Sequence, residues 1–253
     1  MKIDRTKNAG RNIVFGCMLK IYQIVMPFIM RTLMIYYMGI QYLGLNSLFT
    51  SILQVLNLAE LGVGSAMVYS MYKPIAVDDK KMICALMKLY RTYYRVIGII
   101  IAFLGLCLVP FIPKLIKSDV PADINIYVLY ILNLSVTVLS YWLFAYKNCL
   151  LDAHQRTDVA SKVTLVTNTL QYIVQFFTLF FLKNYYAYII VSLAAQALTN
   201  ILTAVVTTHM YPDYRPEGNL SKEVILGINR RIRDLFTSKL GVVIVNSADT
   251  IVI

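Results

Sequence analysis

Four ionisable side chains lie inside long apolar stretches of this sequence. Lys20 and Arg31 are eleven residues apart, or about three helical turns, so they share one helical face. Glu60 lies in the next apolar stretch and Asp249 near the end of the chain. A charge near the centre of a bilayer costs about 2.5–3.5 kcal/mol on insertion scales. These residues are therefore candidates for a role in a polar cavity.

Simpler interpretations exist for some of them. The Lys20 side chain can extend along its helix until the ammonium reaches the inner membrane surface. Glu60 can neutralise a neighbouring Arg or Lys without contacting any ligand. Arg31 lies well inside the outer half of its apolar stretch, so it is the hardest to explain without a cavity.

Uncharged polar residues recur at helical spacing in the same stretches. Spacings of three and four keep each row on one helical face. Such rows can join packed helices by hydrogen bonds worth about 1 kcal/mol a pair. Several rows in one bundle instead favour a shared polar interior, as in a transport cavity. The rows are Asn46, Thr50, Asn57, Glu60 and Gly64; Asn133, Thr137 and Ser140; Thr164, Asn168, Gln171, Gln175 and Thr178; and Ser192, Gln196, Asn200, Thr203 and Thr207.

The composition requires lipid as a solvent. The 253 residues are 58% hydrophobic and 15% charged, whereas a soluble domain carries roughly 25% charged residues. The mean hydropathy is +0.65. The net charge is +11, but the charged residues are clustered between long uncharged runs and form no single basic face, so nucleic-acid binding is not indicated. Membrane lipids are the expected surroundings.

Hydropathy predicts an all-α integral membrane protein with six complete spans and the start of a seventh. A span needs about 20 predominantly apolar residues. The third span is nearly apolar all round and is expected to face lipid. The six spans are Ile13–Tyr37, Tyr42–Tyr69, Tyr94–Ile112, Ile124–Tyr146, Lys162–Leu182 and Tyr185–Met210.

The positive charges predict the orientation. If the N-terminus is cytoplasmic, the inner segments hold 19 of the 24 Lys and Arg residues and the outer loops hold 3. Cytoplasmic loops carry such an excess, so the N-terminus is expected inside. The chain divides into a bundle over 1–211, a cytoplasmic linker with an amphipathic helix over 212–239, and an incomplete seventh span over 240–253.

Motifs of soluble enzymes are absent from the sequence. It has no P-loop, no GxSxG, no HExxH and no GxGxxG after a strand, so no catalytic residue is assigned. The four cysteines form no CxxC pair and read as small buried hydrophobes, with no metal or redox site. Transport would therefore depend on an ion gradient or on the gradient of the substrate itself.

Three stretches resemble a known family. They are the run from Tyr42 (YLGLNSLFTSIL) with that from Asn57 (NLAELGVGSA) and Met71 (MYKPIA), the run from Leu150 (LLDAHQR), and the run from Lys239 (KLGVVIVNSADTIVI). They are similar to bacterial polysaccharide flippases, the repeat-unit exporters of capsule and O-antigen in the MATE-like superfamily. The resemblance covers almost the whole chain, and its most specific part is the second span.

The resemblance implies two facing six-helix bundles with alternating access and no cofactor. The cargo would be an undecaprenyl-diphosphate-linked oligosaccharide, exported across the bacterial cytoplasmic membrane alongside polysaccharide polymerase or synthase proteins. Lys20 and Arg31 would hold the diphosphate by charge-assisted hydrogen bonds. Glu60 or Asp249 would take up a coupling proton or sodium ion. Sugar hydroxyls would meet the amides of Asn46, Asn57, Asn168, Gln171, Gln175, Gln196 and Asn200.

This chain is about half the length of that family's members. Residues 240–253 would extend about 21 Å as a helix, against a hydrocarbon core of about 30 Å. We therefore expect a C-terminal truncation that leaves the first bundle and the beginning of the second.

Two other functions remain open. A drug or cation exporter of the same fold should have an acidic, aromatic cavity, and Lys20 and Arg31 argue against that. A scaffold of a polysaccharide synthase complex would not need the polar rows. A membrane glycan polymerase or ligase is less favoured, because such enzymes usually need a large outer loop, whereas the longest here spans about residues 113–123.

Overall fold

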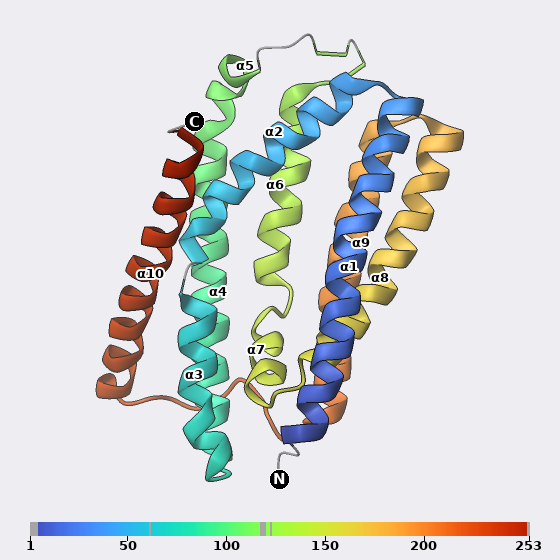
Figure 1. Ribbon diagram of the computed structural model, residues 1–253. Helices are drawn as coiled ribbons and strands as arrows, with labels where there is room; N and C mark the ends of the chain where they lie inside the picture. The colour runs from blue at the N-terminus through green and yellow to red at the C-terminus, as the bar shows by residue number, and fades with distance from the viewer. Residues whose placement is uncertain (1–4, 61, 117–119, 122, 252–253) are drawn as a thin grey trace.

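The computed structural model describes residues 5–60, 62–116, 120–121 and 123–251, and this part of the chain is helical with no strand (Figure 1). The helical elements are α1 (Arg5–Tyr37), α2 (Ile40–Leu56), η1 (Asn57–Glu60), α3 (Val63–Ala76), α4 (Lys80–Leu108), η2 (Val109–Phe111), α5 (Ile112–Leu115), α6 (Ile126–Trp142), α7 (Tyr146–Ala153), α8 (Thr157–Phe177), the π-helical η3 (Thr178–Leu182), α9 (Tyr185–Met210) and α10 (Lys222–Ile251).

Short polar residues begin several of these helices. The Asp79 carboxylate accepts a hydrogen bond from the Met82 N–H at the start of α4. The Asn125 and Asn184 side chains do the same for the first turns of α6 and α9. Such caps satisfy N–H groups that have no partner within the helix. Gly39, at φ 110°, turns the chain between α1 and α2, a backbone conformation that glycine adopts at little cost.

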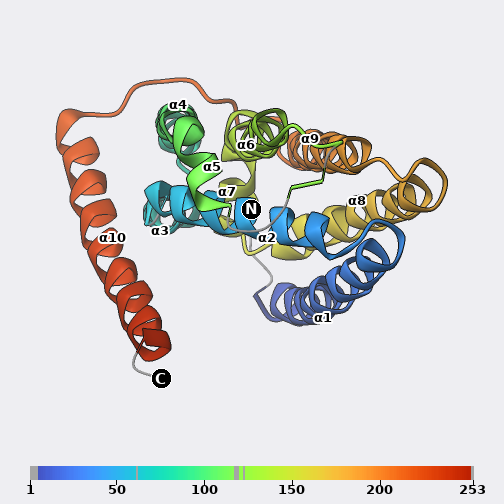
Figure 2. The same cartoon turned by 90° about the horizontal axis from the view of Figure 1, so that it is seen from above.

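The long helices form an arc rather than a closed ring. Seen from above in Figure 2, the arc runs from α10 through α4, α6, α9 and α8 to α1, with α2, α3 and α7 on its inner side. The packed pairs agree from α1 to α4, since α1 contacts α8, α8 contacts α9, α9 contacts α6 and α6 contacts α4. At the other end, α10 contacts the inner helix α3, which packs on α4. The first helix therefore lies beside a helix that begins 120 residues after its end.

A buried charge cluster ties α1 to α8 at the end of the bundle that holds the N-terminus, here called the N-terminal end. Asp158 is completely buried and its carboxylate lies 2.9 Å from Arg156 Nε, 3.3 Å from Lys162 Nζ and 4.0 Å from Arg11 Nε. The Asn12 side chain bonds both the Asp158 N–H and the Gln155 carbonyl. The cluster therefore fixes the first turns of α1 against the start of α8.

The described residues contain four helices long and apolar enough to cross a membrane, and a fifth if one bent pair is a single span. The four are Asn8–Tyr37, Lys80–Leu115, Thr157–Leu182 and Tyr185–Met210. The chain thus has the architecture of a helical membrane protein. The third predicted span, Tyr94–Ile112, is the second half of a helix that begins fourteen residues earlier, at Lys80.

The prediction of one continuous helix over Tyr42–Tyr69 is wrong. The α-helix ends at Leu56, a 3₁₀ turn follows over Asn57–Glu60, and α3 begins at Val63. Gly62 has a left-handed backbone conformation, at φ 91°, and separates the 3₁₀ turn from α3. Hydropathy reports only that such a segment is apolar, and it carries no information on where the backbone hydrogen bonds are interrupted.

The fourth predicted span, Ile124–Tyr146, is also broken. Helix α6 ends at Trp142, and α7 leaves it at an angle of 51°. Phe144, in the three-residue break, has a positive φ of 58°. The predicted boundary between a linker helix and a seventh span at residues 239–240 is not a helix end, because α10 runs through it without a break.

Candidate functional site

Both broken helices open at the same level of the bundle. The break between α2 and α3 brings Asn57 and Glu60 to the inner side of the arc, and the break between α6 and α7 lies beside it, since α3 packs on α7 and α2 on α6. Gly62 is required here for a second reason. A Cβ on Gly62 would lie 3.0 Å from the Ile232 carbonyl oxygen and the Phe236 nitrogen of α10.

Two cavities meet at these breaks. The larger, here the Glu60 cavity, has a volume of about 980 Å³ and is lined from α3, α4, α6, α7, α9 and α10. The smaller, here the Arg31 cavity, has a volume of about 360 Å³ and is lined from α1, α2, α6, α8 and α9. Asn57 lines both cavities. These volumes lie in the range of ligand sites, which is about 300–1,000 Å³.

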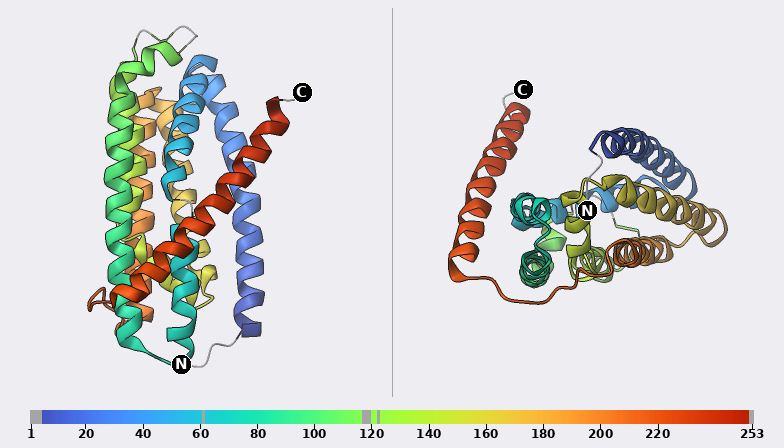
Figure 3. Two further views of the ribbon diagram at one scale, coloured as in Figure 1. Left: turned by 90° about the vertical axis from the view of Figure 1, so that its left-hand side faces the viewer. Right: turned by 90° about the horizontal axis from the view of Figure 1, so that it is seen from below.

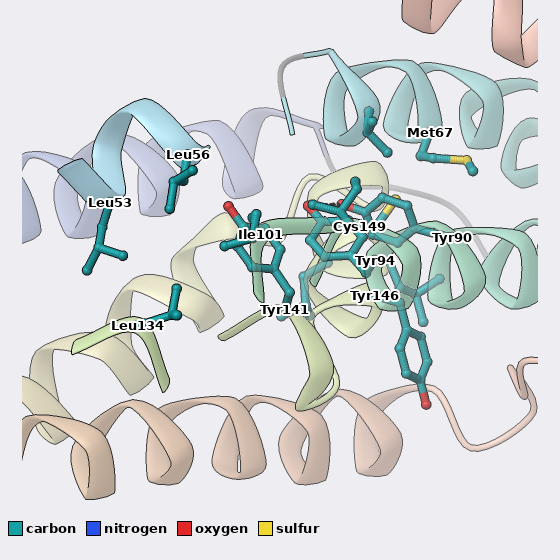
Figure 4. Close-up of a cluster of buried hydrophobic side chains, with 14 of the residues drawn as sticks. Leu53, Leu56, Met67, Tyr90, Tyr94, Ile101, Leu134, Tyr141, Tyr146 and Cys149 are labelled. Atoms are coloured by element: carbon teal, nitrogen blue, oxygen red, sulfur yellow. Dashed lines mark hydrogen bonds between the residues drawn. The ribbon is translucent and has the colours of Figure 1, made fainter. Parts of the chain in front are cut away.

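Tyrosines surround the Glu60 carboxylate. Tyr94 donates a hydrogen bond to Glu60 Oε1, and Tyr90 donates to the Tyr94 hydroxyl at 2.7 Å. Tyr141 donates to Asn57 Oδ1 at 3.1 Å. Figure 4 shows these three rings close together in the core. Tyr94, the hydrogen-bond donor to Glu60, is neutral, and no Lys or Arg forms an ion pair with Glu60 among the described residues.

The Glu60 cavity is acidic and aromatic. Asp152 from α7 provides a second carboxylate, and the rings of Tyr69 and Tyr72 join those of the buried tyrosines. Lys239 is the cation of its wall, and its ammonium lies 3.1 Å from the Ser65 hydroxyl. Such a cavity fits a cation, or sugar hydroxyls that bond to carboxylate and phenol oxygens.

Arg31 gives the second cavity the opposite character. It is the charged residue of that wall, is exposed, and forms no ion pair among the residues that the structure describes. Amides lie opposite: Gln175, only 1% exposed, donates to the Ser192 hydroxyl at 2.8 Å and to the Tyr188 carbonyl at 3.2 Å. A guanidinium among amides and hydroxyls is suited to an anion such as a phosphate.

The predicted site residues therefore divide between two cavities. Arg31, Asn46, Gln171 and Gln175 line one; Glu60, Gln196 and Asn200 line the other; and Asn57 lies between them. Part of the polar row on α9 also joins this helix to α6, because the Asn200 amide donates a hydrogen bond to the Ser140 carbonyl at 3.1 Å. Within α9, the Asn200 side chain accepts a hydrogen bond from Gln196.

Two predicted residues lie elsewhere, and a third is not described. Lys20 is exposed and Asn168 is half-buried, and neither lines these two cavities. Lys20 lies about 16 Å along α1 from Arg31 at 1.5 Å a residue, too far for both to hold one diphosphate. The side chain of Asp249 lies outside the described part of the chain. No group of three His, Cys, Asp or Glu residues suited to a metal ion occurs among the described residues.

Sequence reasoning missed the tyrosines and Asp152. The third predicted span began at Tyr94 and was expected to face lipid, whereas Tyr94 is 8% exposed and contacts Glu60. A sequence signal existed, because Tyr90 and Tyr94 are four residues apart and so share a helical face. Asp152 lies in the quoted run from Leu150, but its place in a cavity depends on the bend before α7.

Comparison with known proteins adds no relative to this picture. No protein-family model, no curated protein and no solved structure matches the chain. The chemistry of the two cavities is therefore the basis on which a function is assigned.

Proposed function

We propose that this protein is a membrane transporter that moves undecaprenyl-diphosphate-linked oligosaccharide across the bacterial cytoplasmic membrane. The observation that carries the proposal is the meeting of two broken apolar helices at two polar cavities. In a membrane, an interrupted backbone is tolerated where it lines a cavity or is buried in protein, and transporters form their sites from such helices. A scaffold protein needs neither the breaks nor the cavities.

In this proposal the two cavities bind different parts of the cargo. Arg31 binds the diphosphate by paired N–H donors, and the amide of Gln171 binds an adjacent oxygen, while Gln175 holds α8 to α9 through Ser192 and the Tyr188 carbonyl. The Glu60 cavity receives the sugars, whose hydroxyls bond to tyrosines, Asn200 and Gln196. Glu60 takes up the coupling proton or sodium ion, because it is a membrane-embedded carboxylate that forms no ion pair within the described part of the chain.

The proposal includes the finer topology expected from the sequence. The chain then forms a bundle of six spans in one half of a MATE-like two-bundle transporter that works by alternating access. The α2–η1–α3 segment counts as one interrupted span and α6–α7 as another. The excess of Lys and Arg at the N-terminal end supports a cytoplasmic N-terminus.

A cation exporter is the second candidate function. The specific observation in its favour is the larger cavity, where Glu60 and Asp152 lie among the rings of Tyr69, Tyr72 and Tyr94. Carboxylates and aromatic faces together bind organic cations. In this alternative Arg31 has no cargo to hold, so its substitution should leave export intact.

The test is depletion of the native gene followed by measurement of undecaprenyl-diphosphate-linked oligosaccharide by mass spectrometry of lipid extracts. The flippase proposal predicts accumulation of this lipid and loss of surface polysaccharide. Wild type and Lys183→Gln should reverse both, since Lys183 is an exposed residue outside both cavities. Arg31→Gln at an equal protein level should reverse neither.

Two results would refute the proposal. Depletion that causes sensitivity to cationic dyes without lipid accumulation would assign the protein to the exporter class. Depletion that changes neither quantity would leave a non-transporting role. Full complementation by Arg31→Gln would remove Arg31 from diphosphate binding.

A further inference from the structure

A third cavity lies away from the two described above, on the flank of the bundle between α3, α4 and α10. It is a groove of about 630 Å³ at the N-terminal end, where α10 begins and α3 ends. In the left panel of Figure 3, α10 begins near this end and slants across the bundle, passing α3 close to the start of that helix. The groove, here called the α3–α10 groove, is lined by Tyr69, Ser70, Tyr72, Lys73, Pro74, Val77, Asp79, Met82, Leu86, Val224, Gly227, Ile228 and Arg231.

The walls of this groove are mainly apolar. Pro74 and Ile228 are buried at its floor, and Met82, Leu86 and Val224 continue the apolar surface. Gly227 leaves space in α10, since a Cβ built on it would meet no atom within 4 Å. An apolar groove of this kind, on the flank of a helical membrane protein, is suited to an acyl chain.

Two cations give the groove a polar end. Arg231 is held in place by its Nη1–H bond to the Ser70 hydroxyl at 2.9 Å and by the ring of Tyr69, 4.2 Å from its guanidinium carbon. Neither Arg231 nor Lys73 forms an ion pair among the described residues. The remaining guanidinium N–H groups are thus available to an anion, and phosphate oxygens match their geometry.

The carboxylate in the groove does not cancel these charges. Asp79 lines the groove and caps α4 by accepting from the Met82 N–H at 3.0 Å, but Lys73 and Arg231 face this single carboxylate, so the lining keeps a net positive charge. The groove also lies where basic residues gather, with Lys222 and Arg230 on the adjoining turns of α10. A cation that contacts the headgroup of an anionic lipid contributes about 1 kcal/mol. Lys73 and Arg231 line the groove, whereas Lys222 and Arg230 lie outside it and contribute less.

We propose that the α3–α10 groove binds one anionic phospholipid, with the phosphate between Lys73 and Arg231 and an acyl chain along the apolar wall past Gly227. The lipid joins α10 to α3, and this contact lies one to two helical turns from Gly62, where α10 also approaches the break. Tyr69 and Tyr72 line both the groove and the Glu60 cavity, and the other lining residues of the two cavities differ.

The test uses the full chain purified in detergent and titrated with phosphatidylglycerol or phosphatidylcholine, with bound lipid counted by native mass spectrometry. Wild type should bind one phosphatidylglycerol at least about tenfold more tightly than phosphatidylcholine. The double substitution Lys73→Gln, Arg231→Gln should weaken phosphatidylglycerol binding about thirty-fold. The matched double substitution Lys222→Gln, Arg230→Gln removes the same charge outside the groove and should weaken it less than about threefold.

A second pair of variants tests the apolar channel without changing charge. Gly227→Leu fills the groove at a helical position with free space and should abolish binding. Gly241→Leu makes the same change at another open position of α10 and should leave binding intact.

Any of four results would overturn the proposal. They are equal affinity for phosphatidylcholine, equal losses in the matched charge variants, unchanged binding in Gly227→Leu, and displacement of phosphatidylglycerol by an equimolar polyprenyl diphosphate. The last result would assign the groove to the cargo lipid instead.

Discussion

Replacing Asp158 by asparagine should loosen the N-terminal end of α1 from α8. The substitution keeps the shape of the side chain and removes the negative charge that three cations share. Because α1 carries Arg31 and α8 carries Gln171 and Gln175, the same change should disturb the Arg31 cavity from a distance. Asp158→Asn is therefore expected to lower stability and to change the Arg31 cavity together.

The magnitude follows from the burial of each member. Removing one partner of a buried ion pair costs about 3–5 kcal/mol, because the remaining charge is left without compensation. Here the carboxylate is fully buried, but the side chains of Arg11, Arg156 and Lys162 keep 34%, 23% and 44% of their surface exposed. Water therefore solvates part of the released charge, and we expect about 3 kcal/mol. At about 2–4 °C per kcal/mol, the Tm should fall by about 6–12 °C.

The assay is thermal unfolding of the purified protein in detergent, followed by circular dichroism. Asp213→Asn is the matched control, because Asp213 also pairs with a lysine, at 2.6 Å from Lys80, but is 64% exposed. Exposed pairs contribute little, so its Tm should stay close to that of wild type. Adding Lys162→Gln to Asp158→Asn should recover part of the loss. Equal shifts for Asp158→Asn and Asp213→Asn would refute the reasoning.

Three further predictions concern single positions. Gly62→Ala should lower the free energy of unfolding by about 1–3 kcal/mol, because Gly62 has a positive φ and its Cβ would lie 3.0 Å from the α10 backbone. Gly44→Ala should be tolerated, since a Cβ there meets no atom within 4 Å. Denaturant titration measures both, and equal costs would contradict the structural role of Gly62. Tyr94→Phe removes a hydrogen bond to the Glu60 carboxylate and should lower transport about tenfold at equal protein level. Tyr36→Phe, on the exposed face of α1, should transport like wild type. Equal transport by wild type and both variants would exclude a role of the Tyr94 hydroxyl in transport. Burial lowers the pKa of His154 from its ordinary value, so the unfolded chain gains a proton first and the folded state loses stability as the pH falls below about 6.5. In Tm measurements from pH 8 to pH 5, His154→Gln should lose less than wild type and His209→Gln, an exposed histidine, should follow wild type; parallel curves for all three would count against the assignment.

The sequence alone determined that the chain needs a membrane and that its polar residues share interior faces. Both conclusions depend on composition and on helical periodicity, which are local properties of the chain. Gln175 and Asn200 were predicted to face the interior and are 1% and 8% exposed. The predicted carboxylate in the second span, Glu60, lines a cavity as well.

The positions where helices break depended on tertiary structure. The 3₁₀ turn at Asn57–Glu60 and the 51° bend before Tyr146 leave the run of apolar residues unchanged, so hydropathy cannot report them. Packing of α3 on α7 and of α10 on Gly62 holds these conformations in place. The continuous α10 has the same origin, because its amphipathic first half and apolar second half have different patterns but one backbone geometry.

Tertiary structure also decided which polar residues meet. Lys20 and Arg31 share a helical face and are both exposed, yet of the two only Arg31 lines a described cavity, whose other walls come from α2, α6, α8 and α9. Tyr94 joins Glu60 across 34 residues of chain, a contact that no periodicity within one helix contains. Periodicity therefore defines which side of a helix is polar, and only the packing of helices defines what that side faces.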